Sequence, residues 1–290
     1  MHFSKRNALA MATALCSALL YVGAISASAA TTNGVTPDTT ATVSGDAAYK
    51  AATDTNPVPP LTPDEQKTLD QKRQEATNLL SGTASTATVR ANSSAASASS
   101  TSASGSIALS QDQNPQKTKY YCGPASVREA LGQMGQWFTQ DQLAGELGTT
   151  TAGTGWLNGS SGPVPRVLNA HQSRRSYFGT PVSSSPSSGE INYFKLGLAT
   201  NIPLLGVPLI GDAYEVKGGP HLAGHPNRAE PIFHWFDIYG YTNSGNYTKY
   251  EDSVHGVSTS IISWASSVPA YSSILTSKIV QIVGGRGYVW

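Results

Sequence analysis

Cysteine is scarce in this chain. Among its 290 residues only Cys16 and Cys122 are cysteines, and Cys16 lies in an apolar run at the N-terminus. A fold held together by disulfides within the chain is therefore excluded. In an exported protein, one unpaired thiol indicates either a reactive group or a bridge to another molecule. Cys122 is thus the leading candidate for a reactive side chain.

The chain also lacks a large net charge and, beyond its N-terminal residues, a segment that could span a membrane. Only 13% of the residues are charged, and the formal net charge is +1. This balance gives no reason to expect nucleic acid or an anionic membrane as a partner. After residue 30, no apolar stretch is long enough to cross a bilayer.

The first 29 residues have the pattern of a secretory signal peptide. Lys5 and Arg6 form a short basic region, an apolar run follows through Val22, and 27–29 read Ala-Ser-Ala, a typical cleavage signal. Cys16 belongs to this removable segment. Without residues 1–29 the chain has 17 basic and 18 acidic residues, a formal charge of −1. We expect a secreted, extracellular protein with no transmembrane anchor after signal removal.

Aromatic residues are absent from residues 50–119. Residues 30–115 are rich in Ala, Ser and Thr, a composition that cannot bury much of a core, so we expect a largely disordered linker or pro-segment. One helix is predicted within it, at 63–80, because Thr62-Pro-Asp-Glu65 combines a capping box with Pro at the first helical position. Its polar composition favours a solvated helix; a docking element is the alternative.

Residues 116–290 hold 21 of the 24 aromatic residues. These 175 residues are enough for a single domain with its own core. The elements expected within it are helices near 139–148, 164–171, 191–198 and 258–264, and strands over 202–209, 279–283 and 287–290.

Cys122 is expected at the start of a helix. Gly123-Pro124 suits a turn entering a helix, and apolar residues then recur at helical spacing, at Val127, Ala130, Leu131 and Met134. The first N–H groups of a helix are unpaired and carry the positive end of its dipole, which favours a thiolate over a thiol. Cys122 is therefore predicted to be a nucleophile.

Gln116, six residues before the cysteine, is the candidate for an oxyanion hole. Its side-chain amide and the Cys122 backbone N–H could share the negative oxygen of a tetrahedral intermediate. The plainer alternative is that Cys122 is a small buried hydrophobe and Gln116 an ordinary loop residue.

A β-hairpin is predicted over residues 233–252, with its turn at 243–246. It places His234 and Asp252 near corresponding ends of adjacent strands, where the imidazole could reach Cys122 on one side and the carboxylate on the other. His234 is therefore the expected base and Asp252 its partner.

Asp237 and His255 are the alternative candidates for these two roles, and Glu251 is the neighbour of Asp252. Asp237 is three residues from His234, so its side chain should point to the other face of the strand. Glu251 should likewise point away from Asp252 and be solvated. His255, just past the second strand, is the rival base.

His221 and His225 are spaced four residues apart, as zinc ligands on a helix can be. They lie in a Gly/Pro-rich loop, however, with no evident carboxylate or thiol partner. We therefore expect no metal site.

The ordered set of motifs resembles the C39-like branch of the papain-type cysteine peptidases. The likeness rests on Gln116, on Cys122-Gly-Pro-Ala-Ser, on His234 opening a strand that ends in Gly240-Tyr241, and on Asp252 closing the next strand. It extends to Leu143-Ala144, Gly153-Thr154 and the Pro203–Pro208 segment. Tyr121 and Ser253 stand where the family commonly has an acidic residue and a proline.

The resemblance implies an α+β, papain-like fold in which a cysteine-bearing helix packs on an antiparallel sheet. It also implies roles: Cys122 attacks a carbonyl, His234 transfers the proton, Asp252 fixes the imidazole and Gln116 helps to form the oxyanion hole. A peptide or protein substrate, an acyl-thioester intermediate, no cofactor and a monomer are expected. A catalytically silent binding domain and a thiol acyltransferase are the alternatives.

Overall fold

The computed structural model describes residues 58–82 and 105–290, which belong to one compact unit. The predicted signal peptide, residues 1–29, lies outside these stretches, and so does most of the predicted linker. Among the described residues, no helix combines the length and apolar character needed to cross a membrane.

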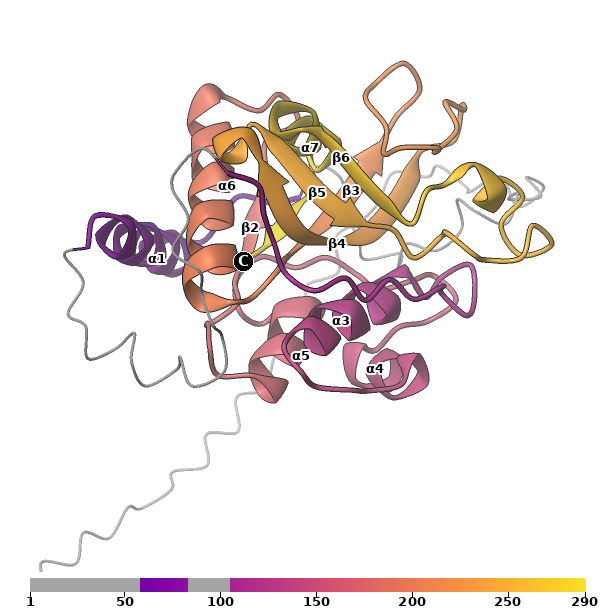
Figure 1. Ribbon diagram of the computed structural model, residues 1–290, viewed down its shortest axis with the longest axis horizontal. Helices are drawn as coiled ribbons and strands as arrows, with labels where there is room; N and C mark the ends of the chain where they lie inside the picture. Colours follow the sequence, from indigo (N-terminus) through magenta and orange to yellow (C-terminus); the bar gives the residue numbers. More distant parts are fainter. Residues whose placement is uncertain (1–57, 83–104) are drawn as a thin grey trace, which may run out of the picture. The chain divides into compact units, whose positions relative to one another are not determined.

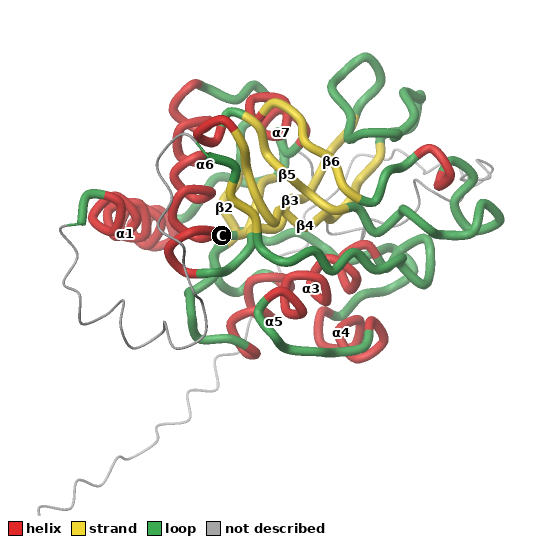
Figure 2. Tube along the Cα trace, in the orientation of Figure 1, coloured by secondary structure: helices red, strands yellow, loops and turns green. Residues whose placement is uncertain are grey.

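An α+β fold is built on a seven-stranded antiparallel sheet, as expected (Figures 1 and 2). Six strands follow the order β2-β7-β3-β4-β5-β6, and β1 pairs with the C-terminal half of β4. The strands are β1 (Ile107–Ala108), β2 (Gly179–Pro181), β3 (Leu209–Glu215), β4 (Ile232–Thr242), β5 (Tyr247–Glu251), β6 (Tyr271–Leu275) and β7 (Gly287–Val289).

Helices cover both faces of the sheet. In Figure 1, α3, α4 and α5 gather on one side of it, and α6 lies on the other. The helices are α1 (Pro63–Leu80), α3 (Cys122–Gln133), α4 (Gln140–Leu147), α5 (Pro163–His171), α6 (Ser188–Thr200) and α7 (Thr276–Ile282). Short helical turns also occur at η1 (Asn201–Leu205), η2 (Asn243–Gly245) and η3 (Ala265–Ser267).

The alternation of side chains along the strands places one apolar cluster on each face of the sheet. Trp235 joins Cys122 and the α3–α5 side chains, whereas its neighbour Phe236 faces the cluster of α6 and α7. At the C-terminus, Val289 and Trp290 alternate in the same way. The sheet therefore has a buried layer on each face, and α3 is fixed against β4.

Helix α1 forms over the predicted range, with the predicted capping box at Thr62. It is not simply solvated, because Leu69, Lys72 and Ala76 are buried. The Lys72 ammonium donates to the Ser176 carbonyl at 2.6 Å and lies 4.8 Å from the centre of the Trp290 ring. The narrow apolar stripe was too sparse to predict docking from the sequence, but the described contacts favour the docking alternative for this segment.

Residues 105–115, assigned to the linker from their composition, lie against the sheet. Strand β1 pairs Ile107 with Tyr241 and Ala108 with Gly240, and the Leu109 N–H donates to the Tyr239 carbonyl at 2.8 Å. Backbone pairing needs no aromatic side chains, which is why composition gave no sign of this edge strand.

Three predicted elements take another form. The run 202–209 is not a strand: it continues α6 as the wide turn η1, where Pro203 lacks the N–H that α-helical bonding needs, and strand β3 begins only at Leu209. The run 279–283 belongs to helix α7, where packing on the sheet outweighs the β propensity of Ile and Val. Residues 258–264 form turns, in which serine hydroxyls bond locally.

Candidate active site

Cys122 is the first residue of α3, as the sequence predicts. The preceding Tyr121 offers no side-chain cap, so the unpaired N–H groups of the first turn surround the cysteine. Helix α3 is tied to β4 by a hydrogen bond of 2.9 Å from the Ser126 hydroxyl to the Trp235 carbonyl. At Gly123 a Cβ atom would overlap the Thr154 side chain, so glycine is required where this loop crosses the helix.

His234, on β4, lies between Cys122 and Asp252. Its Nε2 is 3.0 Å from the Asp252 Oδ1, and its side chain also shares a hydrogen bond with Cys122. Since Nε2 is occupied by the carboxylate, Nδ1 is the ring nitrogen left for the sulfur. All three side chains are at least 98% buried. The structure therefore brings together the three residues that the sequence predicts as nucleophile, base and orienting acid.

Asp252 directly follows β5, at the start of the turn by which the chain leaves the hairpin. Its Oδ1 accepts the Val254 N–H at 2.9 Å in addition to His234, and its backbone carbonyl accepts the Gln113 amide at 3.0 Å. These bonds fix the carboxylate relative to the backbone of its own turn.

The two competing residues lie elsewhere. Asp237 accepts a hydrogen bond of 2.7 Å from Gln133, near the C-terminal end of α3. The Nδ1 of His255 is bonded to the Val268 carbonyl at 2.8 Å. The bond of His234 goes to Asp252 rather than to Asp237, and the ring of His255 is bonded away from Asp252, which favours Asp252 and His234 over both.

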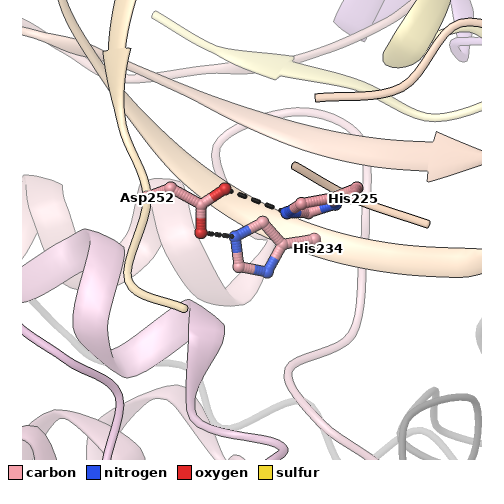
Figure 3. A group of neighbouring side chains, drawn as sticks. All are labelled: His225, His234 and Asp252. Carbon is pink, nitrogen blue, oxygen red and sulfur yellow. Dashed lines mark hydrogen bonds and ion pairs between the residues drawn. The ribbon is translucent and has the colours of Figure 1, made fainter. Parts of the chain in front are cut away.

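A second histidine, His225, bonds the same carboxylate (Figure 3). Its Nε2 lies 3.0 Å from the Asp252 Oδ2, and its Nδ1 lies 2.8 Å from the Glu215 Oε2. Glu215 also accepts the Leu222 N–H at 2.6 Å. The expectation that His221 and His225 lack a carboxylate partner is wrong, because Glu215 contacts both, with His221 at 3.4 Å.

The electrostatics of this buried row follow from alternating charges. For His234, burial opposes the charged form, but the Asp252 charge and hydrogen bond outweigh it and raise the pKa to about 10. Burial likewise opposes charge on His225, yet Glu215 and Asp252 raise its pKa to about 9. Burial would raise the pKa of Asp252, but the two histidines hold it well below its usual range. At neutral pH both histidines are therefore cationic and Asp252 is anionic.

Gln116 is buried and linked to the residue after Asp252. Its backbone N–H donates to the Ser253 carbonyl at 2.8 Å, and its side-chain oxygen accepts the Ser253 hydroxyl at 3.1 Å. The amide nitrogen donates one hydrogen to the Thr118 carbonyl at 2.7 Å, which leaves its second hydrogen for another acceptor. The loop before α3 is thus fastened to the turn that carries Asp252.

Glu251 points away from the Asp252 side, but it is not solvated as expected. It is fully buried, and its carboxylate accepts the Gln133 amide at 2.8 Å and the Asp112 N–H at 3.1 Å. Helix α3 and the segment before it cover this face of the hairpin, which local alternation cannot reveal. Burial raises the pKa of Glu251 to about 7.

Among the described residues, one group of three His, Cys, Asp or Glu side chains has its ligand atoms close enough to hold a metal ion, all within 4.8 Å of one another. It consists of His225, His234 and Asp252. These atoms are already bonded in pairs, because each Asp252 oxygen takes a different imidazole nitrogen. Hydrogen bonds therefore account for the cluster without a metal.

Sequence reasoning missed Glu215, Ser253 and the role of His225. Glu215 could not be found from the sequence because its position depends on the register of β3 on β4. This register pairs Ala213 with His234 and places Glu215 two residues further along β3. Because residues two apart on a strand share a face, Glu215 comes to the same side of the sheet as His234.

A cysteine at a helix N-terminus, facing a His–Asp pair on an antiparallel sheet, is the architecture of the papain-like cysteine peptidases. Within that class, residues 107–274 match the Peptidase_C39 like family, and the chain belongs to this family. Membership supports a peptidase.

Comparison with solved structures includes a protein described as a C39-like peptidase from Bacillus anthracis. It is 12% identical, with a TM-score of 0.39, and the match covers 63% of this chain and 96% of that one. Among curated proteins there is no match.

Proposed function

We propose that this protein is a cysteine peptidase that hydrolyses amide bonds of a peptide or protein substrate. The observation that carries the proposal is the continuous hydrogen-bonded row from Cys122 through His234 to Asp252, at the N-terminus of α3. Such a row performs nucleophilic catalysis when the nucleophile, the base and the orienting group are in contact.

The reaction begins from a thiolate–imidazolium pair. His234 keeps its proton at neutral pH because Asp252 stabilises the cation, and the unpaired N–H groups of α3 favour the Cys122 thiolate. The thiolate attacks the scissile carbonyl carbon, and the oxygen takes the negative charge. The Cys122 N–H and the remaining Gln116 amide hydrogen are the proposed donors to that oxygen.

Collapse of this intermediate breaks the C–N bond. His234 gives its proton to the leaving amine, and the acyl group stays on Cys122 as a thioester. Water then attacks the thioester, with His234 taking the water proton, and the carboxylic acid product leaves. Asp252 stays ionised throughout and holds the imidazole in position. No metal or organic cofactor enters these steps.

Export is part of the proposal. The signal pattern of residues 1–29 predicts that the protein acts outside the cell. The proposed substrate is therefore an extracellular peptide or protein, which contains the amide bonds that the thiol would hydrolyse. Mass-spectrometric detection of peptides from residues 116–290 in the secreted fraction of a culture tests the location separately from the activity.

The activity is tested with a mixture of unfolded proteins, whose new termini are identified by mass spectrometry. Wild-type protein should produce cleavage, and Cys122→Ala and His234→Ala should not. Adding a primary amine distinguishes transfer from hydrolysis, because a transferase would leave the amine on the new C-terminus. Cleavage that persists in Cys122→Ala contradicts the proposal.

A substrate-independent test is alkylation of Cys122 by iodoacetamide across pH. An activated thiolate reacts with a midpoint well below the ~8.5 of a free thiol, and this advantage should disappear in His234→Ala. A wild-type midpoint near ~8.5 contradicts the proposal whatever the substrate.

A further inference from the structure

His225 has no part in the three-residue row, yet both of its ring nitrogens bond carboxylates within the buried site. Nε2 bonds Asp252 at 3.0 Å (Figure 3). Nδ1 bonds Glu215 at 2.8 Å, and the His225 side chain is fully buried. A histidine serving only to fill space would not need two buried anions.

The hydrogen-bond geometry fixes the protonation of this ring. An ionised carboxylate only accepts hydrogen bonds, and a neutral imidazole has a single N–H. Burial opposes the charge of Glu215, but His225, His221 and the Leu222 N–H lower its pKa to about 2, so Glu215 is ionised at neutral pH. Two bonds to two carboxylates therefore require that His225 carries a proton on each nitrogen.

Asp252 depends on this donor. Its Oδ1 is held by His234 and the Val254 N–H, and its Oδ2 is held by His225. Asp252 is almost completely buried. Without His225, Oδ2 would therefore be a buried anionic oxygen with no hydrogen-bond donor. The free-energy cost of that state is larger than the contribution of a neutral hydrogen bond. The carboxylate would then turn, and the direction of its bond to His234 would change.

The surroundings leave His225 little freedom. The Trp264 ring packs against it with centroids 4.5 Å apart, and the His234 ring lies 5.3 Å away. Glu215 is anchored at the end of β3, the strand that pairs with the His234 strand. The donor is thus held by the same sheet that carries the base.

We propose that His225, held by Glu215, is a positioning residue that fixes the Asp252 carboxylate and thereby aligns His234 with Cys122. His225 acts through Asp252, the carboxylate that it shares with His234. This inference rests on the proposed function, since it assigns His225 to the same catalytic row.

Two variants separate the two bonds of the imidazole. The His225→Gln amide nitrogen lies near the place of Nε2, so it keeps a donor on Asp252. The His225→Asn amide nitrogen lies near the place of Nδ1, so it keeps the link to Glu215 and loses Asp252. In alkylation of Cys122, His225→Asn should move the pH midpoint up by about one unit or more, so that the rate at pH 6 falls about tenfold. His225→Gln should retain most of the wild-type rate.

The matched control is His171→Gln, the same substitution on α5, where His171 contacts Glu146 and the Phe138 ring. It should leave the midpoint unchanged. A folded His225→Asn with the wild-type midpoint overturns the proposal, and so does an equal shift in the Asn and Gln variants. Hydrolysis should show the same order in kcat, with KM unchanged.

A measurement on the wild-type protein keeps the proposal testable if a variant does not fold. Nitrogen-15 NMR at pH 7.5 should show both His225 ring nitrogens protonated, and a single protonated nitrogen overturns the proposal. The two hypotheses fail separately: an unreactive wild-type thiol contradicts the peptidase, whereas a reactive thiol indifferent to His225 contradicts only the positioning role.

Discussion

The charge of Asp252 is expected to set the protonation of His234, and Asp252→Asn removes that charge with little change of shape. The His234 Nε2 and the Asp252 Oδ1 are 3.0 Å apart. At an effective dielectric constant of about 20, two unit charges at this distance attract by about 5 kcal/mol. Since one pKa unit corresponds to 1.36 kcal/mol, the pair can account for up to about 4 units.

The expected change is somewhat smaller than this limit. The pKa of His234 is raised to about 10 from its ordinary value of 6.5, a net rise that already includes the opposing effect of burial on the charged ring. In Asp252→Asn the burial remains and the attraction does not. The pKa should therefore fall by about 3.5 units or more, to its ordinary value or below.

The variant should still fold. The asparagine oxygen can accept the His234 and Val254 N–H groups. Its amide nitrogen can face His225, which then keeps only the proton that it donates to Glu215. The loss of activation thus reports electrostatics rather than unfolding.

Two assays follow the change. NMR titration of the His234 ring measures the pKa directly, and iodoacetamide alkylation at pH 6.5 should slow by about tenfold or more as the imidazolium is lost. The matched control is Asp141→Asn, the same substitution at an exposed carboxylate paired with Lys117. A His234 pKa within half a unit of the wild-type value in folded Asp252→Asn would refute the reasoning.

Three further predictions concern the supports of the site. Ser253→Ala removes the hydroxyl that orients the Gln116 amide and should lower kcat about tenfold with KM unchanged. This loss is smaller than the ~100-fold or larger fall in kcat that follows removal of an oxyanion donor itself. Gly123→Ala should lower the free energy of unfolding by about 1–3 kcal/mol, because the added methyl overlaps Thr154. Folded Glu251 holds its proton up to about pH 7, whereas the unfolded side chain releases it near 4.5, so the folded state binds more protons in this window. The free energy of unfolding then falls as pH rises from about 4.5 to about 7, and Glu251→Gln should remove up to about 3 kcal/mol of that fall.

Each of these has a control in the chain. Ser260→Ala changes an exposed serine and should leave kcat unaltered. Gly145→Ala, in α4 with no atom near the added methyl, should stabilise by up to about 1 kcal/mol, and an equal effect of the two glycine substitutions would count against the crowding at Thr154. For Glu251, unfolding measured across pH in Asp141→Asn gives the reference slope, and a Glu251→Gln slope equal to that of wild type would disprove the assignment.

Local sequence determined much of the chemistry. The helix starting at Cys122 and the hairpin carrying His234 and Asp252 follow from patterns within about 20 residues, because a helix period or a strand alternation needs only neighbouring side chains. Order and spacing were then enough to predict that these three residues meet.

Tertiary packing decided what local patterns could not. Glu215 was missed because the preceding strand was predicted over 202–209, whereas Pro203 extends α6 and β3 begins at Leu209, which sets the register that brings Glu215 beside His225. The sequence also placed Glu251 in solvent, since nothing in its own strand reveals that α3 covers it.

The same distinction holds for the second histidine. In the sequence, His225 is one of two histidines in a Gly/Pro-rich loop, a setting with no periodicity from which to predict a direction or a partner. Only the closure of the sheet brings its ring between Glu215 and Asp252, which lie 37 positions apart in the chain. The sequence by itself determined which groups do the proposed chemistry, and the tertiary structure determined what holds them, because burial and hydrogen-bond partners arise from contacts between distant segments.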